Sequence, residues 1–294
     1  MIKEINFLNS FGDKLFGNAW EIEKPKYVLL LVTGMAEHSA RYDDFASFLN
    51  KHYFNVFCLD HYNQGKNGIL GHGSPDYFFK MEKTIDEYIL FLKDKFNLPV
   101  FVFAHSMGSF VLQGYIENYH NADKVVLCGS NYMGPIAKVG NTLAKMIVNK
   151  KNYNKPAGFL NSLSIGAYEK TCKGLDSPNA WISYNKDNYH KYDQDKLCGQ
   201  HCTNGFFKEF LNGLASLNKK DKLKTINKDL PILIIGGDSD PVGNNGKGLR
   251  KLDELYTKNG LNSTLIIYEH MKHEVLNEEE NMKVYKDIAN FLKA

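Results

Sequence analysis

Short apolar runs and amphipathic segments alternate along the first part of the chain. The runs, such as residues 26–32 and 100–103, are rich in β-branched and aromatic residues, which predicts strands buried on both faces. In the segments between them, apolar residues recur at helical spacing, as Ile85, Ile89 and Leu92 do. This alternation predicts a mainly parallel sheet with right-handed crossovers and helices on both faces. The eight predicted strands are residues 4–9, 14–22, 26–32, 54–59, 100–103, 124–128, 231–237 and 264–268.

The alternation of strands and helices stops after the sixth predicted strand. Residues 131–206 show no strand pattern and are rich in Asn, Tyr and Lys, but two stretches near Leu143 and Leu160 have helical apolar spacing. We therefore interpret residues 131–206 as a helical insertion in a core made of residues 1–130 and 207–294. The helices predicted for the core are residues 40–52, 81–96, a segment that begins after Ser106, and residues 206–217, 249–256 and 278–292.

Charge and composition argue against several classes of function. The 294 residues contain 36 Lys and Arg against 33 Asp and Glu, a net charge of only +3, and the lysines are dispersed. A nucleic-acid-binding protein needs a concentrated basic surface, so we expect no nucleic-acid partner. Residues 1–4 lack the apolar stretch of a signal peptide, and the apolar run 27–32 is far too short to cross a bilayer. We expect no integral membrane segment, and the sequence leaves the oligomeric state open.

The chain contains five cysteines. Cys58 and Cys128 fall in predicted strands and are interpreted as reduced core thiols, so we expect a cytoplasmic protein. Cys198 and Cys202 lie close together, but no second pair of ligands follows at a spacing typical of a zinc site. We therefore expect no metal and no organic cofactor.

The candidate nucleophile is Ser106, in the sequence Ala104-His105-Ser106-Met107-Gly108. This sequence lies between a predicted buried strand and a helix pattern, and small residues stand two positions before and after the serine. That is the pattern of a nucleophile elbow, in which the serine sits on a strained turn and larger flanking side chains would collide with the strand or helix. A serine that only caps the following helix is the alternative.

A serine hydroxyl needs a base to take its proton and a third group to orient that base. On a strand–turn–helix scaffold of this kind the acid, and then the histidine, follow the serine along the chain. Asp238 and Asp240 follow the seventh predicted strand, and His270 and His273 follow the eighth. Pro241 keeps Asp240 extended, whereas Asp238 is the better turn residue, so we favour Asp240 as the acid. His273 lies further along its loop than His270, so we favour His273 as the base.

An oxyanion hole needs two backbone N–H groups directed at the developing negative charge. One is expected from Met107, the residue after the nucleophile at the start of the helix. The second is expected from the loop after the strand 26–32, where Met35 follows Gly34. Met35 is therefore the second candidate, acting through its backbone alone.

Several segments together resemble one known family. In the insertion they are residues 181–183 (Trp-Ile-Ser) and 192–199 (Tyr-Asp-Gln-Asp-Lys-Leu-Cys-Gly). In the core they are residues 34–42 (Gly-Met-Ala-Glu-His-Ser-Ala-Arg-Tyr), the elbow 104–108, residues 237–243 (Gly-Asp-Ser-Asp-Pro-Val-Gly) and residues 272–278 (Lys-His-Glu-Val-Leu-Asn-Glu). Over essentially its whole length the chain is similar to the lysophospholipase and monoacylglycerol lipase branch of the α/β-hydrolases.

This resemblance implies an α/β-hydrolase fold with a mainly parallel eight-stranded sheet, helices on both faces and a helical cap. It implies Ser106, Asp240 and His273 as a catalytic triad, and the N–H groups of Met35 and Met107 as the oxyanion hole. The insertion would form the cap over the acyl pocket, and a transient contact of the cap with a membrane surface stays open. The expected substrate is a small-molecule acyl ester, namely a lipid-like monoacyl ester such as a lysophospholipid or a monoacylglycerol.

The chain departs from the family pattern at four places. Thr33 replaces the usual histidine before Gly34, and residues 60–65 (Asp-His-Tyr-Asn-Gln-Gly) replace the usual Asp-x-Arg-Gly-x-Gly. Ser109 stands where a second glycine usually follows the elbow, and residues 184–185 (Tyr-Asn) replace Arg-Asp in the cap. None of these departures removes a triad residue.

Three hypotheses follow. The first is a cofactor-independent serine carboxylester hydrolase. The second is a serine aminopeptidase of the proline-iminopeptidase type, which needs acidic groups to hold the α-ammonium of its substrate; Glu37 is the only obvious acid in the predicted active-site loops. The third is a ligand-binding protein that has lost catalysis, supported only by the substitutions at Thr33 and Ala104.

Overall fold

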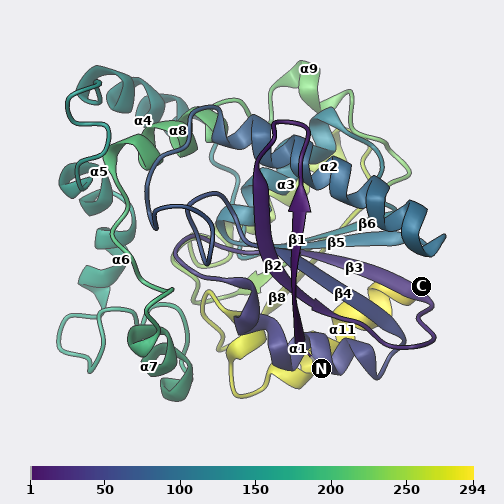
Figure 1. The fold of residues 1–294 in the computed structure, drawn as a ribbon. Coiled ribbons are helices and arrows are strands. Elements are labelled where there is room, and N and C mark those ends of the chain that lie inside the picture. The colour runs from purple at the N-terminus through teal and green to yellow at the C-terminus, as the bar shows by residue number, and fades with distance from the viewer. Residues whose placement is uncertain (1) are drawn as a thin grey trace.

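One sheet of eight strands organises the chain, in the order β1-β2-β4-β3-β5-β6-β7-β8 (Figure 1). The structure is a computed structural model that describes residues 2–294. β1 and β2 form an antiparallel hairpin and β2 is antiparallel to β4, whereas all other neighbours are parallel. The mainly parallel sheet expected from the sequence is confirmed. The strands are β1 (Ile2–Leu8), β2 (Lys14–Trp20), β3 (Tyr27–Val32), β4 (Phe54–Leu59), β5 (Val100–His105), β6 (Lys124–Cys128), β7 (Ile232–Gly237) and β8 (Ser263–Tyr268).

Helices cover both faces of this sheet, because alternate residues of each strand point to opposite faces. Leu29 and Leu31 of β3 pack in a cluster with residues of α1 (Asp43–Asn50) and α11 (Asn281–Lys293). Leu30, between them, packs in the other cluster, which contains residues of α2 (Tyr77–Phe96), α3 (Met107–Asn118) and α10 (Lys247–Lys258). In Figure 1, α1 and α11 accordingly lie below the sheet, and α2 and α3 lie above it.

The segment between β6 and β7 contains helices joined by loops, with one isolated bridge between Pro156 and Thr203. Its first four helices, teal in Figure 1, lie together at one side of the sheet. A small cluster of their buried side chains, which includes Trp181 and Ile182, is separate from the two clusters of the sheet. α8 packs on α4 and on α2 and so joins this segment to the core. The helices are α4 (Gly134–Ile147), α5 (Gly158–Ser162), α6 (Ile165–Thr171), α7 (Lys186–Gln194), α8 (Asn204–Leu214) and α9 (Lys220–Leu223).

Several predicted boundaries are corrected by packing and capping. α2 begins at Tyr77, one turn before the predicted residue 81, because Tyr77 and Phe78 are buried. α8 begins at Asn204 rather than 206, because the Thr203 hydroxyl accepts a hydrogen bond from the N–H of Phe206 and caps the helix. The predicted helix 40–52 divides into a 3₁₀ turn (Ser39–Tyr42) and α1. The predicted helix 278–292 begins only at Asn281, after a 3₁₀ turn (Val275–Asn277).

Helices α6 and α7 did not stand out in the sequence. α7 reads Lys-Asp-Asn-Tyr-His-Lys-Tyr-Asp-Gln and has no apolar stripe. Its buried side chains are instead held by polar contacts, such as the hydrogen bond of 2.7 Å from Asn188 to Glu274. None of the helices in residues 2–294 combines the length and the apolar composition needed to cross a bilayer.

Candidate active site

Ser106 occupies the turn between β5 and α3, as the sequence predicts. Its backbone lies at φ 51° and ψ −121°, a positive-φ conformation that costs free energy for a residue other than glycine. Ser106 stands at the N-cap position of α3, but its side chain makes no capping hydrogen bond, so the alternative in which this serine serves only as a helix cap is wrong. Gly108 is needed for close packing, because a Cβ there would lie 2.4 Å from the carbonyl oxygen of Thr33. The strained turn places Ser106 at the wall of a cavity.

His273 and Asp240 form a buried pair next to this turn. The two atoms His273 Nδ1 and Asp240 Oδ1 are 3.0 Å apart, and the side chains are 3% and 0% exposed. Asp240 Oδ1 also accepts a hydrogen bond of 2.8 Å from the N–H of Val242, which fixes the carboxylate. With the Nδ1 proton directed at Asp240, Nε2 of His273 is left as a proton acceptor. Asp238 and His270 are not part of this pair: Asp238 bonds Ser239, and His270 is exposed.

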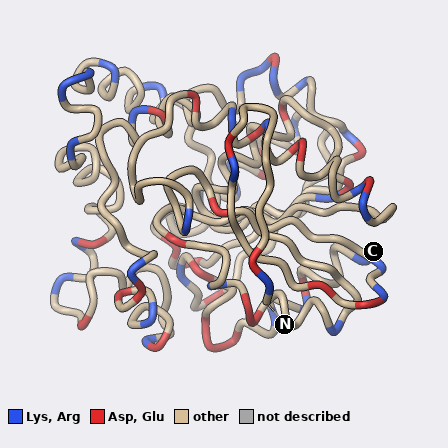
Figure 2. Tube along the Cα trace, in the orientation of Figure 1, with Lys and Arg blue, Asp and Glu red and all other residues tan. Residues whose placement is uncertain are grey.

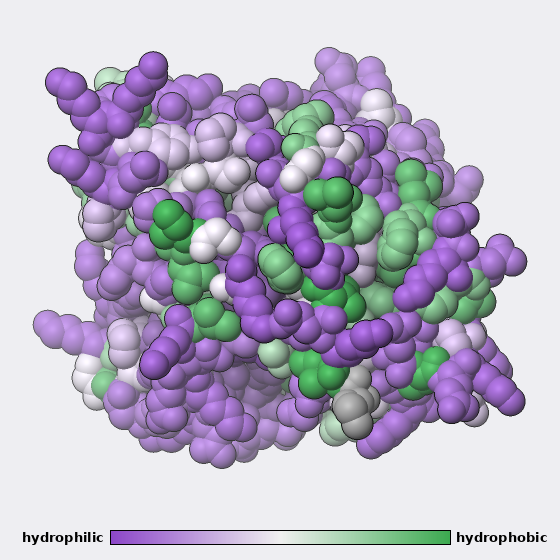
Figure 3. Space-filling model, in the orientation of Figure 1, coloured by the Kyte–Doolittle hydropathy of each residue, from purple (hydrophilic) through white to green (hydrophobic). Residues whose placement is uncertain are grey.

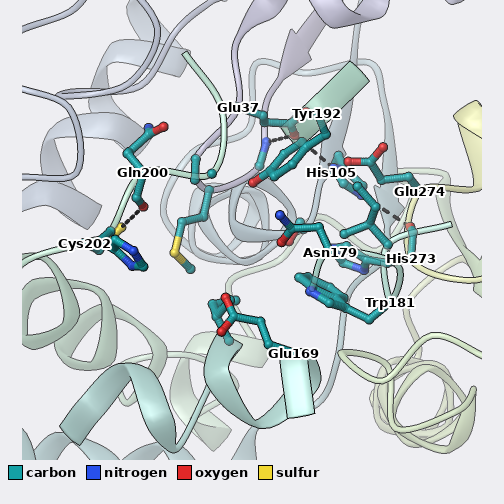
Figure 4. Close-up of a pocket in the computed structure, with 18 of the residues that line it drawn as sticks. Glu37, His105, Glu169, Asn179, Trp181, Tyr192, Gln200, Cys202, His273 and Glu274 are labelled. Atoms are coloured by element: carbon teal, nitrogen blue, oxygen red, sulfur yellow. Dashed lines mark hydrogen bonds and ion pairs between the residues drawn. The ribbon is translucent and has the colours of Figure 1, made fainter. Parts of the chain in front are cut away.

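Ser106 and His273 line the same cavity, which has a volume of about 60 Å³. No hydrogen bond within residues 2–294 joins the Ser106 hydroxyl to His273. In structures without substrate, the hydrogen bond between a nucleophile and its base is often long or poorly aligned. The rings of His105 and Trp181 pack on His273, with centroid distances of 4.7 and 5.3 Å. Figure 4 shows that side chains from the core and from the segment between β6 and β7 face one another across this space.

The loop after β3 offers one free amide to the cavity. The N–H of Gly34 donates to the carboxylate of Glu37, and the N–H of Ala36 donates to Gln64 Oε1 at 2.8 Å. Between them, the N–H of Met35 has no acceptor in the described part of the chain, and neither has the N–H of Met107 at the start of α3. Both predicted oxyanion donors thus lack an intramolecular partner within residues 2–294.

At one wall of the cavity lies a buried group of four ionisable side chains, Glu37, Arg41, His105 and Glu274, here called the ionic cluster. Arg41 donates hydrogen bonds of 2.8 and 2.7 Å to Glu274 and one of 2.9 Å to Glu37. His105 Nδ1 lies 3.0 Å from Glu37 Oε1. All four side chains are at most 11% exposed. Buried charges of this kind are stable only when they are paired and hydrogen-bonded, as they are here.

Hydrogen bonds and opposite charges within the ionic cluster favour the charged forms of Glu37 and His105. Burial alone would raise the pKa of Glu37, but its hydrogen bond to His105 and the charges of His105 and Arg41 outweigh burial and hold that pKa well below its usual range. Burial alone would lower the pKa of His105, but the hydrogen bond and charge of Glu37 outweigh it and raise that pKa. His105 also faces the carbonyl oxygen of His273, with Nε2 at 3.4 Å. The cluster therefore ties together the loop after β3, the serine elbow and the His273 loop.

The loop 60–65, where the chain departs from the family pattern, still supports the candidate oxyanion loop. The hydroxyl of Tyr77 lies 2.7 Å from His61 Nδ1, and His61 Nε2 lies 2.8 Å from the carbonyl oxygen of Thr33. Burial lowers the pKa of His61 to about 4, so the ring is neutral and carries its proton on Nε2. A neutral histidine and Gln64 thus hold the two ends of the segment that contains Met35.

Some cavity residues carried no signal in the sequence. Glu169 of α6 lines the cavity without an ion pair in residues 2–294, and Asn179 lines it from the loop after α6. Figure 4 shows the carboxylate of Glu169 directed into the cavity. Glu37, the acid singled out in the sequence, also lines it, but its carboxylate is taken up by His105 and Arg41. Only the structure shows that Glu37 is paired with other side chains and that Glu169 is not.

The sheet order, the strained serine after β5 and the buried Asp–His pair after β7 and β8 define an α/β-hydrolase. The protein-family model described as "Serine aminopeptidase, S33" matches residues 23–280, most of the chain. The chain therefore belongs to this family and is a serine hydrolase. The family resemblance expected from the sequence is confirmed.

Curated relatives and a solved structure agree with this assignment. The chain is 26% identical to the monoglyceride lipase of Homo sapiens over 94% of this chain and 86% of that protein. It is 23% identical to the monoacylglycerol lipase of Mycolicibacterium smegmatis over 98% of this chain and 96% of that protein. The fold is shared with a thermostable carboxyl esterase from Bacillus coagulans, solved in complex with glycerol, at a TM-score of 0.90 and 23% identity over 99% of this chain and 98% of that one.

Proposed function

We propose that the protein is a cofactor-independent carboxylester hydrolase that cleaves lipid-like monoacyl esters, monoacylglycerols or lysophospholipids, through an acyl-enzyme on Ser106. The observation that carries the proposal is the buried pair of Asp240 and His273 beside a strained serine, at a cavity lined by Ser106, His273 and Met35. The lipase names of the relatives support the choice of ester over amide. The reducing cytoplasm expected from the sequence is part of this proposal, and all five cysteines are free thiols.

In the proposed reaction the oxygen of Ser106 attacks the ester carbonyl while Nε2 of His273 takes the hydroxyl proton. Asp240 holds the imidazole in place and stabilises its positive charge. The N–H groups of Met35 and Met107 stabilise the negative charge on the carbonyl oxygen. His273 then gives its proton to the leaving alcohol. A water molecule, deprotonated by His273, cleaves the acyl-enzyme, releases the fatty acid and restores Ser106.

We assign residues 131–206 to a cap over the acyl pocket, on a core of residues 1–130 and 207–294. Ile165, Trp181 and Ile182 of the segment give the cavity an apolar wall, whereas Glu169 and Asn179 give it polar groups. The apolar wall fits an acyl chain, and the polar groups fit a hydroxylated or cationic head group. The cavity has a volume of only about 60 Å³, so the cap has to move before a long acyl chain can enter.

The proposal predicts that the purified protein hydrolyses a monoacylglycerol with a kcat/KM at least about 100-fold above that for prolyl-naphthylamide. The physical reason is that an aminopeptidase needs carboxylates for the substrate ammonium, and Glu37 is engaged in the ionic cluster. The test compares both substrates and a lysophosphatidylcholine, with Ser106→Ala as the blank. A preference for the prolyl amide would establish the aminopeptidase alternative, with Glu169 as its free carboxylate.

The same panel tests the assignment of the head-group site. Glu169→Gln is expected to raise KM for a monoacylglycerol about 10-fold, because a hydrogen bond to a charged group is lost, and to leave a p-nitrophenyl ester unaffected. Glu254→Gln, a change of an exposed residue on α10, is the matched control. An equal effect of Glu169→Gln on both esters would contradict the assignment.

The cap also offers a surface for transient membrane contact. Ile136, Val139 and Met146 of α4 are 73%, 69% and 79% exposed. Lys138 and Lys145 lie on the same helix, and basic residues predominate around it in Figure 2. The face shown in Figure 3, by contrast, carries its hydrophobic side chains in small separate groups. Exposed apolar residues among lysines fit an anionic lipid surface.

This surface predicts stronger binding to vesicles of phosphatidylglycerol than to vesicles of phosphatidylcholine in a sedimentation assay. The double variant Val139→Ser and Met146→Ser is expected to lower binding at least about 5-fold, because it removes exposed apolar area. Leu90→Ser on α2, where Leu90 is 46% exposed, is the control and should bind as the wild type does. Equal binding of all three proteins, or no preference for the anionic lipid, would overturn this contact.

A further inference from the structure

Three side chains of metal-ligand type meet outside the catalytic groups, where the loop after β3 contacts the segment after α7. They are His38, Asp195 and Cys198, and their ligand atoms all lie within 4.8 Å of one another. His38 Nε2 is 2.8 Å from Asp195 Oδ2. No sequence motif predicts this cluster, because His38 and Asp195 are 157 positions apart. Cys202, the other cysteine of the sequence motif, is not part of the cluster.

The chain arranges two of the three ligands in one turn. The N–H of Cys198 donates to the carbonyl oxygen of Asp195 at 3.0 Å, and the N–H of Leu197 donates to Asp195 Oδ1 at 2.8 Å. The second hydrogen bond fixes the carboxylate from behind and leaves Oδ2 directed at His38. A ligand oriented by an outer hydrogen bond is a regular feature of metal sites in proteins. This cluster therefore has a preorganised carboxylate and thiol facing an imidazole.

An ion could reach the cluster from solvent. The side chain of Asp195 is 34% exposed, whereas His38 and Cys198 are each 9% exposed. His38 and Asp195 also line a cavity that is open to solvent and has about 870 Å³ of empty space. An ion could therefore enter past Asp195, whereas the sulfur of Cys198 and the imidazole of His38 are largely shielded from solvent.

We propose that His38, Asp195 and Cys198 bind a zinc ion, with water as the fourth ligand. An imidazole nitrogen, a carboxylate oxygen and a sulfur are the three donor types that zinc takes in proteins, and sulfur disfavours magnesium and calcium. The ion would enter between His38 Nε2 and Asp195 Oδ2 and replace the hydrogen bond that now joins them. Binding needs no redox step: the Cys198 thiol loses its proton to solvent as the sulfur–zinc bond forms.

The ion would join the cap to the candidate oxyanion loop. Beside the cluster, the N–H of Gly199 donates to the carbonyl oxygen of Ala36 at 3.0 Å, and Ala36 follows Met35 directly. Zinc would add a second link between the same two segments and hold the cap against the loop. This consequence rests on the proposed function: zinc is expected to slow hydrolysis of long-chain esters, which require cap movement, more than hydrolysis of short ones.

The binding itself is tested without any activity measurement. Zinc is titrated calorimetrically into the full, tag-free chain, and the reactivity of Cys198 toward a thiol reagent is followed by peptide mapping. We expect one saturable site, protection of Cys198, and a melting temperature that rises with zinc concentration. Cys198→Ser and His38→Ala are each expected to weaken binding at least about 10-fold, whereas Cys202→Ser keeps it.

Absence of saturable binding would overturn the site, as would wild-type affinity in Cys198→Ser. So would loss of binding in Cys202→Ser alone. Cys198→Ser is nearly isosteric, so it tests the site even if His38→Ala unfolds the loop. Because these readouts do not involve an ester, their failure is distinct from failure of the hydrolase proposal.

Discussion

Replacement of Ser106 by alanine is expected to lower kcat for ester hydrolysis by about 10⁴-fold or more, since loss of a nucleophile removes the covalent route altogether. The variant should fold normally, because alanine keeps the Cβ and the hydroxyl of Ser106 caps no helix. Steady-state kinetics on a p-nitrophenyl ester measure the loss. Labelling by a fluorophosphonate, which reacts with activated serines, is expected to disappear as well.

The control for this experiment is Ser216→Ala, because Ser216 lies beyond the end of α8 and bonds only the carbonyl oxygen of Gly213. That variant should keep wild-type turnover and labelling. Hydrolysis by Ser106→Ala at more than about a hundredth of the wild-type rate would contradict the assignment of the nucleophile. Labelling of another residue in the wild type would do the same.

Glu37→Gln is expected to lower the free energy of unfolding by roughly 3 kcal/mol, because removal of one member of a buried ion pair leaves the others uncompensated. Glu37 accepts hydrogen bonds from Arg41 and His105 and also from the N–H of Gly34. The substitution should therefore displace the loop that carries Met35 and lower kcat more than it raises KM. Urea unfolding measures the first effect and steady-state kinetics the second.

The effect of Glu37→Gln should depend on pH in a defined direction. The raised pKa of His105 means that its pairing with Glu37 stabilises the fold fully below about pH 6.5 and is lost as the pH rises through that raised value. The lowered pKa of Glu37 means that its own contribution is present above about pH 4.5 and is lost only as the pH falls through the lowered value. The difference between the two proteins is therefore largest between about pH 4.5 and 6.5, and it shrinks as the pH rises through the raised pKa of His105.

Glu4→Gln provides the matched control, because Glu4 forms an ion pair with Lys66 in which both side chains are at least half exposed. Exposed pairs contribute about 0–1 kcal/mol, so this change should hardly alter unfolding at any pH. A stability loss in Glu37→Gln no greater than in Glu4→Gln would show that the ionic cluster does not hold the loops. A difference that grew toward pH 9 would show that His105 is not the protonated partner.

The sheet and the candidate triad could be predicted from the sequence because both depend on short-range patterns. Buried runs mark the parallel strands, and on such a sheet the residues after the carboxyl ends of β5, β7 and β8 meet at one edge, so the chain order of Ser106, Asp240 and His273 carries spatial information. The candidate role of Met35 followed from the same rule. Only the structure shows that the N–H groups of Gly34 and Ala36, on either side of Met35, are hydrogen-bonded, whereas that of Met35 is free.

Features that depend on packing of distant polar residues could not be predicted. α7 has no apolar stripe, because its inner face is made of Asn188, which bonds Glu274, and of two tyrosines: Tyr189 bonds Asp176, and the ring of Tyr192 packs on Arg41. Glu37 and Glu169 have the same side chain, and only the positions of Arg41 and His105 show which one is engaged. Such contacts join residues far apart in the chain, for which a single sequence carries no periodic signal.

The central claim, an acyl-enzyme on Ser106, is tested most directly by rapid quenching of the reaction with a monoacylglycerol, followed by peptide mass analysis. We predict a mass increase equal to the acyl group on the peptide that contains Ser106, formed before the fatty acid is released and absent in Ser106→Ala. An acyl group on a different residue, or hydrolysis that continues in Ser106→Ala, would contradict the account.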